Sequence, residues 1–313
     1  MNTTQIGTSS LLGGRLAYGC WRIAGNHPAQ LTPQQADAGR RAVIAAYEAG
    51  YTLFDHADIY GRGVAETLFG QVLKEIASLR DRIVIATKCG VCPKGIPEPN
   101  LPARWDFSAR HIVAACDGSL RRMGIETIDL LMLHRPDYLA DPEEVARAFT
   151  DLKASGKVRF FGVSNFRPSL VTAVQAACEF PLVAHQVEIS LAKLDAFTDG
   201  TLDQCLQDRM TPMAWSPLAG GLLGEGATRL LPAQQGYRVA PIVTMLDEMA
   251  REHGVSRAVI ALAWLLKHPG KIVPLVGSTN PDRIRDAAKA ADLDLSREEW
   301  YRLLEAARGE PLP

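Results

Sequence analysis

The sequence predicts an α/β fold in which eight parallel strands close into a (β/α)8 TIM barrel. Three observations lead to this prediction. Eight short apolar runs recur along the chain, helical periodicity fills most of the intervals between them, and no linker-like or low-complexity stretch interrupts the alternation. With 313 residues, of which 47% are hydrophobic, the chain can build one large core, and we expect a single domain over residues 1–313.

The apolar runs are mostly continuous rather than alternating, as expected for strands that are buried on both faces. Strands are expected at Leu16–Cys20, Tyr51–Asp55, Ile83–Thr87, Leu130–His134, Val158–Gly162, Leu182–Val187, Pro212–Trp215 and Ile272–Val276. The residues before Leu16 include several glycines and short alternating stretches, which predict a short N-terminal β-hairpin instead of a core strand.

The segments between the runs repeat apolar residues at helical spacing and carry helix end signals. Thr32 before Pro33 predicts a helix start, and Gly50 and Gly124 stand where helices should stop. Helices are expected at Pro33–Ala49, Val64–Ala77, Ser108–Met123, Pro142–Ala154, Pro168–Ala177 and Leu202–Gln207, with extra helices near the C-terminus at Val239–Glu252 and Ser256–Lys267.

A doubly wound parallel sheet is the competing arrangement. It normally has a Gly-x-Gly-x-x-Gly turn after its first strand, whereas Leu16–Cys20 is followed by Trp-Arg-Ile, and the glycine-rich run Gly220–Gly226 has a different spacing. The connections Cys89–Phe107 and Pro217–Arg238 are much longer than the usual connection of about two to six residues. Because barrel active sites lie at the carboxyl ends of the strands, we expect both connections to bind substrate or cofactor.

Charge and hydropathy narrow the functional classes. A formal net charge of -1 and a pI near 6.7 give no electrostatic signature of a nucleic-acid or membrane-surface partner, so a small molecule is the expected ligand. The start of the chain lacks the basic and apolar regions of a signal peptide, and no apolar run approaches the roughly 20 residues of a membrane-spanning helix. A cytoplasmic protein is therefore expected, and its oligomeric state is not predicted.

Six cysteines are scattered through a chain that is too large to be a disulfide scaffold, so reduced thiols are expected. Cys89 and Cys92 are spaced like a redox pair or half of a zinc site. The chain has no second pair at ligand spacing, however, and loop thiols are the preferred interpretation. No metal is expected.

Four polar side chains lie at or just beyond the ends of three consecutive apolar runs: Asp55 with Tyr60, then Lys88, then His134. Each alone is more often a structural residue than a catalytic one, but barrel geometry brings strand ends together. A tyrosine has an ordinary pKa of about 10, and an ammonium held by a carboxylate would stabilise its anion. The four residues together therefore predict a proton-transfer site.

Three segments that contain these residues resemble motifs of the aldo-keto reductase superfamily: Asp55–Gly61, Thr87–Cys89 and Ile128–Asp137. The resemblance covers almost the whole chain. It implies an NAD(P)H-dependent oxidoreductase that transfers hydride reversibly between a nicotinamide cofactor and a small aldehyde or ketone.

The resemblance also implies a role for each of the four residues. Tyr60 would be the general acid and base, with its pKa lowered by Lys88, which is paired with Asp55. His134 would hydrogen-bond the substrate oxygen and orient it.

Cofactor contacts follow from the same resemblance. Ser164, Asn165 and Gln186 would hold the nicotinamide carboxamide, and Trp215 would stack on the nicotinamide ring. The backbone from Ser216 to Gly221, with Pro217, Leu218 and Gly220, would approach the pyrophosphate, and the adenosine 2′-phosphate would meet Ser278, Thr279 and Arg283. NADP(H) is the expected cofactor. Because Gly277 stands where many members carry a lysine, NAD(H) is the alternative.

The substrate is the feature that the residues specify least. Trp21, His56 and Trp105 are expected to line the pocket, and the few residues after Trp300 predict a short C-terminal loop and broad carbonyl tolerance. Two other functions remain open: a Schiff-base aldolase or isomerase that uses Lys88, and a non-catalytic, cofactor-sensing regulatory subunit.

Overall fold

Eight parallel strands close into a barrel, which confirms the predicted fold class. The computed structural model describes residues 1–25, 31–96 and 98–313. Around the barrel the strand order is β10, β11, β12, β3, β4, β5, β8 and β9, so chain neighbours are barrel neighbours. Their bounds are β3 Ala17–Gly19, β4 Leu53–Asp55, β5 Val84–Cys89, β8 Ile128–Leu133, β9 Val158–Ser164, β10 Leu182–Glu188, β11 Thr211–Trp215 and β12 Val273–Val276.

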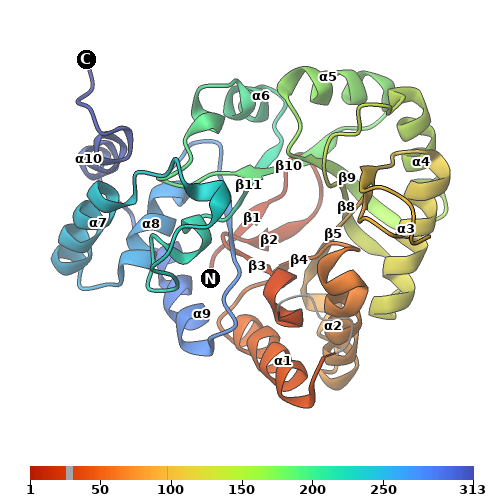
Figure 1. Ribbon diagram of the computed structural model, residues 1–313, viewed down its shortest axis with the longest axis horizontal. Coiled ribbons are helices and arrows are strands. Elements are labelled where there is room, and N and C mark those ends of the chain that lie inside the picture. The colour runs from red at the N-terminus through yellow and green to blue at the C-terminus, as the bar shows by residue number, and fades with distance from the viewer. Residues whose placement is uncertain (26–30, 97) are drawn as a thin grey trace.

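Helices surround the strands on the outside of the barrel (Figure 1). They are α1 Pro33–Glu48, α2 Val64–Glu75, α3 Ala109–Met123, α4 Pro142–Ala154, α5 Pro168–Ala177, α6 Thr201–Gln207, α7 Val239–His253, α8 Arg257–Leu266, α9 Pro281–Ala288 and α10 Arg297–Arg308. Short 3-10 helices are η1 Cys20–Ala24, η2 Tyr60–Gly63, η3 Arg80–Arg82, η4 Asp195–Phe197, η5 Ala219–Gly221, η6 Pro232–Gln234 and η7 Lys289–Asp292. The predicted start of α1 is confirmed, because the Thr32 side chain accepts a hydrogen bond from the Gln35 N–H.

The predicted N-terminal hairpin is formed by β1 (Thr3–Gln5) and β2 (Leu12–Gly14), which pair antiparallel. Its turn is tied to the barrel where the Gly7 N–H donates to the Thr211 hydroxyl at 2.7 Å. Ile6 and Leu11 are buried in the same apolar cluster as the barrel interior. The hairpin therefore closes the amino-terminal end of the barrel and leaves the carboxyl end for ligands.

Alternation along each strand divides the core into two clusters. Leu53, Val84, Leu130 and Met213 belong to the cluster that fills the barrel. Their neighbours Phe54, Ile85, Leu131 and Ala214 belong to the larger cluster between the strands and the helices. Successive side chains of a strand point to opposite faces, so this alternation decides which residues at the strand ends face the barrel axis.

Several elements were not expected from the sequence. The connection Cys89–Phe107 contains a small antiparallel ladder of β6 (Val91–Cys92) and β7 (Arg104–Trp105); Pro97 of this connection lies outside the described residues. Beyond the last barrel strand, α9 and α10 follow. Trp300 of α10 stacks on Trp264 of α8 with ring centroids 5.0 Å apart, and each indole N–H donates to the other residue's carbonyl.

All six cysteines are free, as expected. Among the residues that the structure describes, no helix combines the length and apolar character needed to cross a membrane.

Candidate active site

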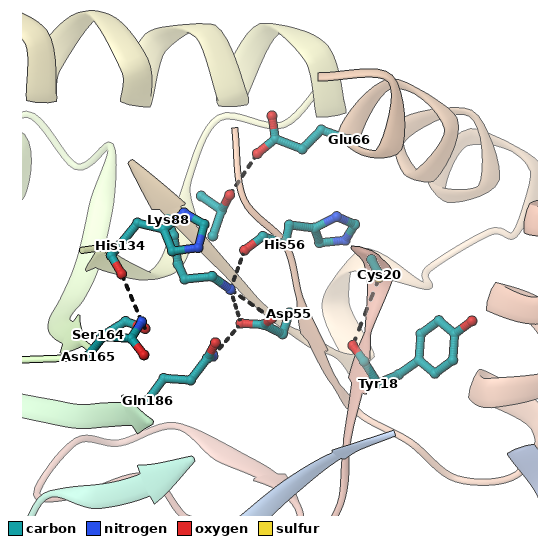
Figure 2. Close-up of polar contacts among 11 residues, drawn as sticks. Tyr18, Cys20, Asp55, His56, Glu66, Lys88, His134, Ser164, Asn165 and Gln186 are labelled. Atoms are coloured by element: carbon teal, nitrogen blue, oxygen red, sulfur yellow. Dashed lines mark hydrogen bonds and ion pairs between the residues drawn. The ribbon is translucent and has the colours of Figure 1, made fainter. Parts of the chain in front are cut away.

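Strand alternation explains why the polar residues at the carboxyl ends of the strands meet. Asp55 follows Leu53 by two positions on β4, and Lys88 follows Ala86 by two on β5, so both continue the inward-facing set. His134, directly after β8, follows Met132 by two positions, and Gln186 follows Ala184 by two on β10. Figure 2 shows these four residues around one centre.

Lys88 and Asp55 form a buried ion pair, each with about 1% of its side chain exposed. Lys88 Nζ lies 2.7 Å from both Asp55 carboxylate oxygens and 2.7 Å from the His56 carbonyl oxygen. Burial alone would lower the pKa of Lys88, but Asp55 and Tyr60 raise it above its ordinary value. The ammonium is therefore a fixed positive charge beneath the barrel mouth.

Gln186 completes the support of the ion pair. Its side-chain amide donates to Asp55 Oδ1 at 2.7 Å, as Figure 2 shows. A buried carboxylate needs its lone pairs satisfied, and here an ammonium and an amide do so together.

Tyr60 begins η2, and its ring lies over Lys88, with 5.1 Å between Nζ and the ring centroid. Burial raises the pKa of Tyr60 to about 12, while the charge of Lys88 and a hydrogen bond with it act in the opposite direction. The Tyr60 ring also meets His134 edge to face, with centroids 6.1 Å apart. The phenol is thus protonated at neutral pH and stands beside a cation that stabilises its anion.

His134 directly follows β8 and is 9% exposed. Burial and the charges of Lys88 and Arg135 lower its pKa to about 2, so the imidazole is neutral at physiological pH. Its Nδ1 atom is buried without a hydrogen-bond partner among the described residues. A neutral imidazole carries one N–H donor, which suits it to hold a carbonyl oxygen.

A second layer holds the strand that carries Lys88. Thr87 alternates with Ala86 and Lys88, so it points away from the barrel axis, and it donates to Glu66 of α2 at 2.7 Å. Glu66 has no exposed surface, and its other oxygen pairs with Arg122 of α3 at 2.7 Å. These contacts on the outer face of β5 fix the strand against two helices, α2 and α3.

Of the three residues predicted to hold a carboxamide, Ser164 and Asn165 lie at the end of β9, beside Trp215 at the end of β11. The third, Gln186 on β10, donates its amide to Asp55 instead. Asn165 donates to the His134 carbonyl oxygen at 3.1 Å and to the Ser164 hydroxyl at 2.8 Å. Its side-chain oxygen accepts from the Trp215 indole N–H at 2.9 Å. Trp215 is partly exposed, so its ring borders the barrel mouth with a fixed orientation.

The loop after β11 forms a tight turn that carries the predicted pyrophosphate contacts. Ser216 and Gly220 have positive φ angles of 50° and 70°, and Pro217 and Leu218 lie between them. The far end of the loop meets α9, because the Arg283 guanidinium donates to the Glu225 carbonyl oxygen at 2.8 Å.

Next to this contact, the predicted phosphate contacts surround the start of α9. Ser278 Oγ accepts from the Asn280 N–H, and Thr279 is exposed beside it. Asn280 caps the helix by accepting from the Asp282 and Arg283 N–H groups. Hydroxyls and an exposed guanidinium at a helix N-terminus suit an anionic group.

The three residues predicted to line the substrate pocket differ in position. Trp21 of η1 and Trp105 of β7 are exposed, by 45% and 40%, and Trp105 meets Tyr138 edge to face. His56 has no exposed surface and packs on Phe69 with ring centroids 4.4 Å apart. It follows Asp55 directly, so alternation turns its ring outward, and it offers no surface to a ligand in the mouth.

Three polar residues near the mouth had no role predicted from the sequence: Arg135, Glu188 and Tyr237. The Arg135 guanidinium lies 5.6 Å from the centroid of the Trp215 ring. Glu188 ends β10 and accepts a hydrogen bond from the Tyr237 hydroxyl at 2.6 Å. Arg135 and Glu188 could have been selected from the sequence by the criterion that selected His134, because both lie at the carboxyl ends of apolar strands.

A family model described as the aldo/keto reductase family matches residues 15–308. A 6-dehydroglucose reductase from Agrobacterium fabrum is 42% identical over 297 residues, which cover 95% of each chain. A 6-dehydroglucose reductase from Novosphingobium aromaticivorans is 42% identical over 315 residues, which cover 99% of this chain and 96% of the relative. Among solved structures, a glycerol dehydrogenase from Gluconobacter oxydans has a TM-score of 0.86 and 26% identity, with 100% of this chain and 98% of that chain covered.

Proposed function

Because this chain belongs to the aldo/keto reductase family, we propose that it reduces small aldehydes or ketones reversibly with NADP(H), in the cytoplasm. Family membership supports carbonyl reduction with a nicotinamide cofactor. The observation that carries the finer proposal is the buried ion pair of Lys88 and Asp55 directly beneath the Tyr60 ring. The six free cysteines are consistent with a reducing compartment.

The residues of the mouth fit a nicotinamide. Trp215 offers a partly exposed flat ring whose orientation Asn165 fixes, and Ser164 lies next to it. A reduced nicotinamide supplies the hydride when it is bound. At the other end of the loop, Arg283 and the hydroxyls of Ser278 and Thr279 would hold a phosphate.

The side chains supply the proton and the orientation. The neutral His134 donates a hydrogen bond to the carbonyl oxygen and aligns it with the Tyr60 hydroxyl. Tyr60 gives its proton to this oxygen as the alcohol forms, and Lys88 stabilises the tyrosinate that remains. Asp55, itself held by Gln186, keeps the ammonium in place. In the oxidation direction Tyr60 takes the proton back.

The Schiff-base alternative is disfavoured by the state of Lys88. A lysine that attacks a carbonyl must be neutral, which requires a lowered pKa. Here the pKa of Lys88 is raised, and the ammonium is hydrogen-bonded to Asp55 and to the His56 carbonyl oxygen. Borohydride treatment in the presence of an aldehyde is expected to leave the mass of the protein unchanged.

A hydroxylated aldehyde is the proposed substrate class. Arg135, Glu188 and Tyr237 place a cation, a carboxylate and a phenol near Trp215, and such groups suit sugar hydroxyls better than an apolar chain. The two relatives at 42% identity are 6-dehydroglucose reductases, which supports a sugar that carries an aldehyde. The proposed substrate class is narrower than the broad carbonyl tolerance expected from the sequence.

The test is steady-state reduction of 6-dehydroglucose by the full chain, with NADPH and NADH compared. We expect turnover with NADPH, and a higher kcat/KM for 6-dehydroglucose than for benzaldehyde. Tyr60→Phe should lower kcat by about 10²- to 10⁴-fold, because the proton donor is lost. Tyr301→Phe, on the outer helix α10, is the matched control and should retain full activity.

The acid–base role, the phosphate contacts and the substrate class can each be rejected by a separate result. Undiminished turnover by Tyr60→Phe would reject the acid–base role. Arg283→Ala should weaken NADPH binding more than NADH binding, because only NADPH carries the additional phosphate. Equal effects on both cofactors, or a wild-type preference for NADH, would reject the phosphate assignment. Faster reduction of benzaldehyde than of the sugar would reject the substrate class.

A further inference from the structure

A thiol, an imidazole and a carboxylate meet outside the catalytic group, where β6, the residues after β7 and α3 come together. The residues are Cys92, Asp106 and His111. Cys92 Sγ lies 3.8 Å from His111 Nε2, and one ligand atom from each of the three residues lies within 4.8 Å of the others. We propose that these three side chains form a binding site for a Zn²⁺ ion, independent of carbonyl reduction.

The backbone holds all three residues in place. In the small ladder, Cys92 pairs with Arg104, and the Asp106 N–H donates to the Gly90 carbonyl oxygen at 2.9 Å. Ser108 then joins the other two: its N–H and hydroxyl donate to Asp106 Oδ1, at 3.1 Å and 2.7 Å, and it caps α3 by accepting from the His111 N–H.

This hydrogen-bonding pattern resembles the outer support of metal sites, in which a ligating carboxylate is oriented by further donors. Both hydrogen bonds from Ser108 reach Asp106 Oδ1, and the described part of the chain leaves Asp106 Oδ2 to coordinate a cation. The cluster is thus arranged by backbone and cap contacts that do not depend on the ion.

The distances match a zinc site that needs only a small closure. With Zn–S near 2.3 Å and Zn–N near 2.0–2.1 Å, sulfur and nitrogen in a tetrahedral site are about 3.6 Å apart. The observed separation of 3.8 Å between Cys92 Sγ and His111 Nε2 is within a few tenths of this value. The Asp106 oxygen lies within 4.8 Å of both other ligand atoms, so a movement of its side chain toward them would bring all three ligands to coordination distance.

The ligand types favour zinc over hard cations. Thiolate and imidazole select Zn²⁺, whereas Mg²⁺ and Ca²⁺ prefer oxygen ligands only. A thiolate, a carboxylate and a neutral imidazole carry a total charge of −2, which neutralises a divalent ion. Cys92 is 5% exposed, so its coordination would be shielded from bulk water.

A cavity provides the fourth position and a route of entry. It has a volume of about 330 Å³, and both Cys92 and His111 line it together with Arg104, Arg62 and Asp58. Three protein ligands with one open direction leave room for a water molecule. A plain thiol–imidazole hydrogen bond is the competing explanation for the 3.8 Å contact, and it predicts no metal-dependent signal.

Co²⁺, a spectroscopic substitute for Zn²⁺, provides the test. Tag-free, full-length protein is titrated with Co²⁺ alone, and the expected result is one ion per chain with a thiolate-to-cobalt charge-transfer band and the intense visible bands of tetrahedral cobalt. Added Zn²⁺ should abolish these bands. A titration without a thiolate band, or without a stoichiometric end point, would overturn the proposal.

Single-residue variants test which side chains bind Co²⁺. Cys92→Ser should remove the charge-transfer band, and Cys92→Ser and Asp106→Asn should each weaken Co²⁺ binding by at least about tenfold. Asp106→Asn retains the oxygen that Ser108 bonds, so it tests the charge with the local fold intact, and circular dichroism checks both variants. Cys178→Ser, a partly exposed thiol at the end of α5, is the matched control and should bind like the wild type. Binding unchanged by Cys92→Ser, or lost in Cys178→Ser, would overturn the assignment.

Discussion

Replacing Lys88 with methionine removes the charge that the structure places beside the proton donor and keeps most of the volume of the side chain. Nζ is 5.1 Å from the centroid of the Tyr60 ring, and both Lys88 and Asp55 are almost completely buried. The variant should therefore raise the pKa of Tyr60 further and slow proton transfer. Asp55 would keep only the Gln186 amide as a side-chain donor. Its negative charge would also raise the pKa of Tyr60 as long as the carboxylate stays ionised.

The size of the effect follows from the separation of the charges. With the centre of the Tyr60 ring standing in for the tyrosinate charge, the separation from Nζ is 5.1 Å, which gives an interaction of about 3 kcal/mol at an effective dielectric constant of about 20. This corresponds to about two pKa units and, if the whole interaction is expressed in the transition state, to roughly a 10²-fold loss of kcat.

The assay is steady-state reduction at saturating NADPH and aldehyde, together with an ultraviolet titration of the tyrosine. Lys267→Met is the matched control, because Lys267 pairs at the surface with Asp294, which is 84% exposed. A Lys88→Met protein that is folded, binds NADPH and keeps kcat within about threefold of the wild type would refute the electrostatic reasoning.

Three further predictions concern titration and buried charge. The kcat of reduction should stay level from about pH 5 to about pH 9, because Tyr60, with a pKa of about 12, keeps its proton and His134, with a pKa of about 2, stays neutral. A pH profile with a step near pH 6.5, the ordinary histidine value, would contradict this. Asp58→Asn should raise the free energy of unfolding by about 1–3 kcal/mol near pH 8 and have little effect near pH 4. Burial and Glu66 raise the folded-state pKa of Asp58 from 3.8 to about 7. The stability of the wild type therefore falls as the pH rises through this window, and the asparagine removes that loss. Urea unfolding at both pH values measures this difference. Arg122→Met leaves the fully buried Glu66 without its ion pair and should lower the free energy of unfolding by about 2–3 kcal/mol, measured in the same way.

Exposed charges on α9 supply the controls for the two stability predictions. Asp282 and Arg285 form a pair with 93% and 53% of their side chains exposed. Asp282→Asn and Arg285→Met should each change the free energy of unfolding by less than about 0.5 kcal/mol. If the controls matched Asp58→Asn and Arg122→Met, net charge rather than burial would explain the effects.

The barrel was predictable because each strand is an apolar run long enough to be recognised without its neighbours. The two-residue strands β6 and β7 were not, since their pairing depends on backbone hydrogen bonds between segments that carry no strand pattern. His56 was expected to line the substrate pocket. Alternation on β4 turns it toward α2 instead, where it packs on Phe69.

Part of the candidate site was also predictable from the sequence. Asp55, Tyr60, Lys88 and His134 could be selected from the sequence because each lies at or just beyond the end of an apolar run, and parallel strands bring their ends to one rim. Their motifs also carried the family resemblance. The convergence of Asp55, Lys88 and His134 follows from strand length and alternation, whereas the position of Tyr60 depends on η2.

The sequence by itself determined the alternation of strands and helices, the identity of the polar strand ends and the family, because these properties depend on local pattern. The pairing of Lys88 with Asp55 was expected, but only the tertiary structure decided which further partners these charges have. Gln186 reaches Asp55 across 131 positions of sequence, and Cys92, Asp106 and His111 meet through a ladder and a helix cap. Such contacts depend on barrel closure and loop packing, which fix distances between residues that no local pattern relates.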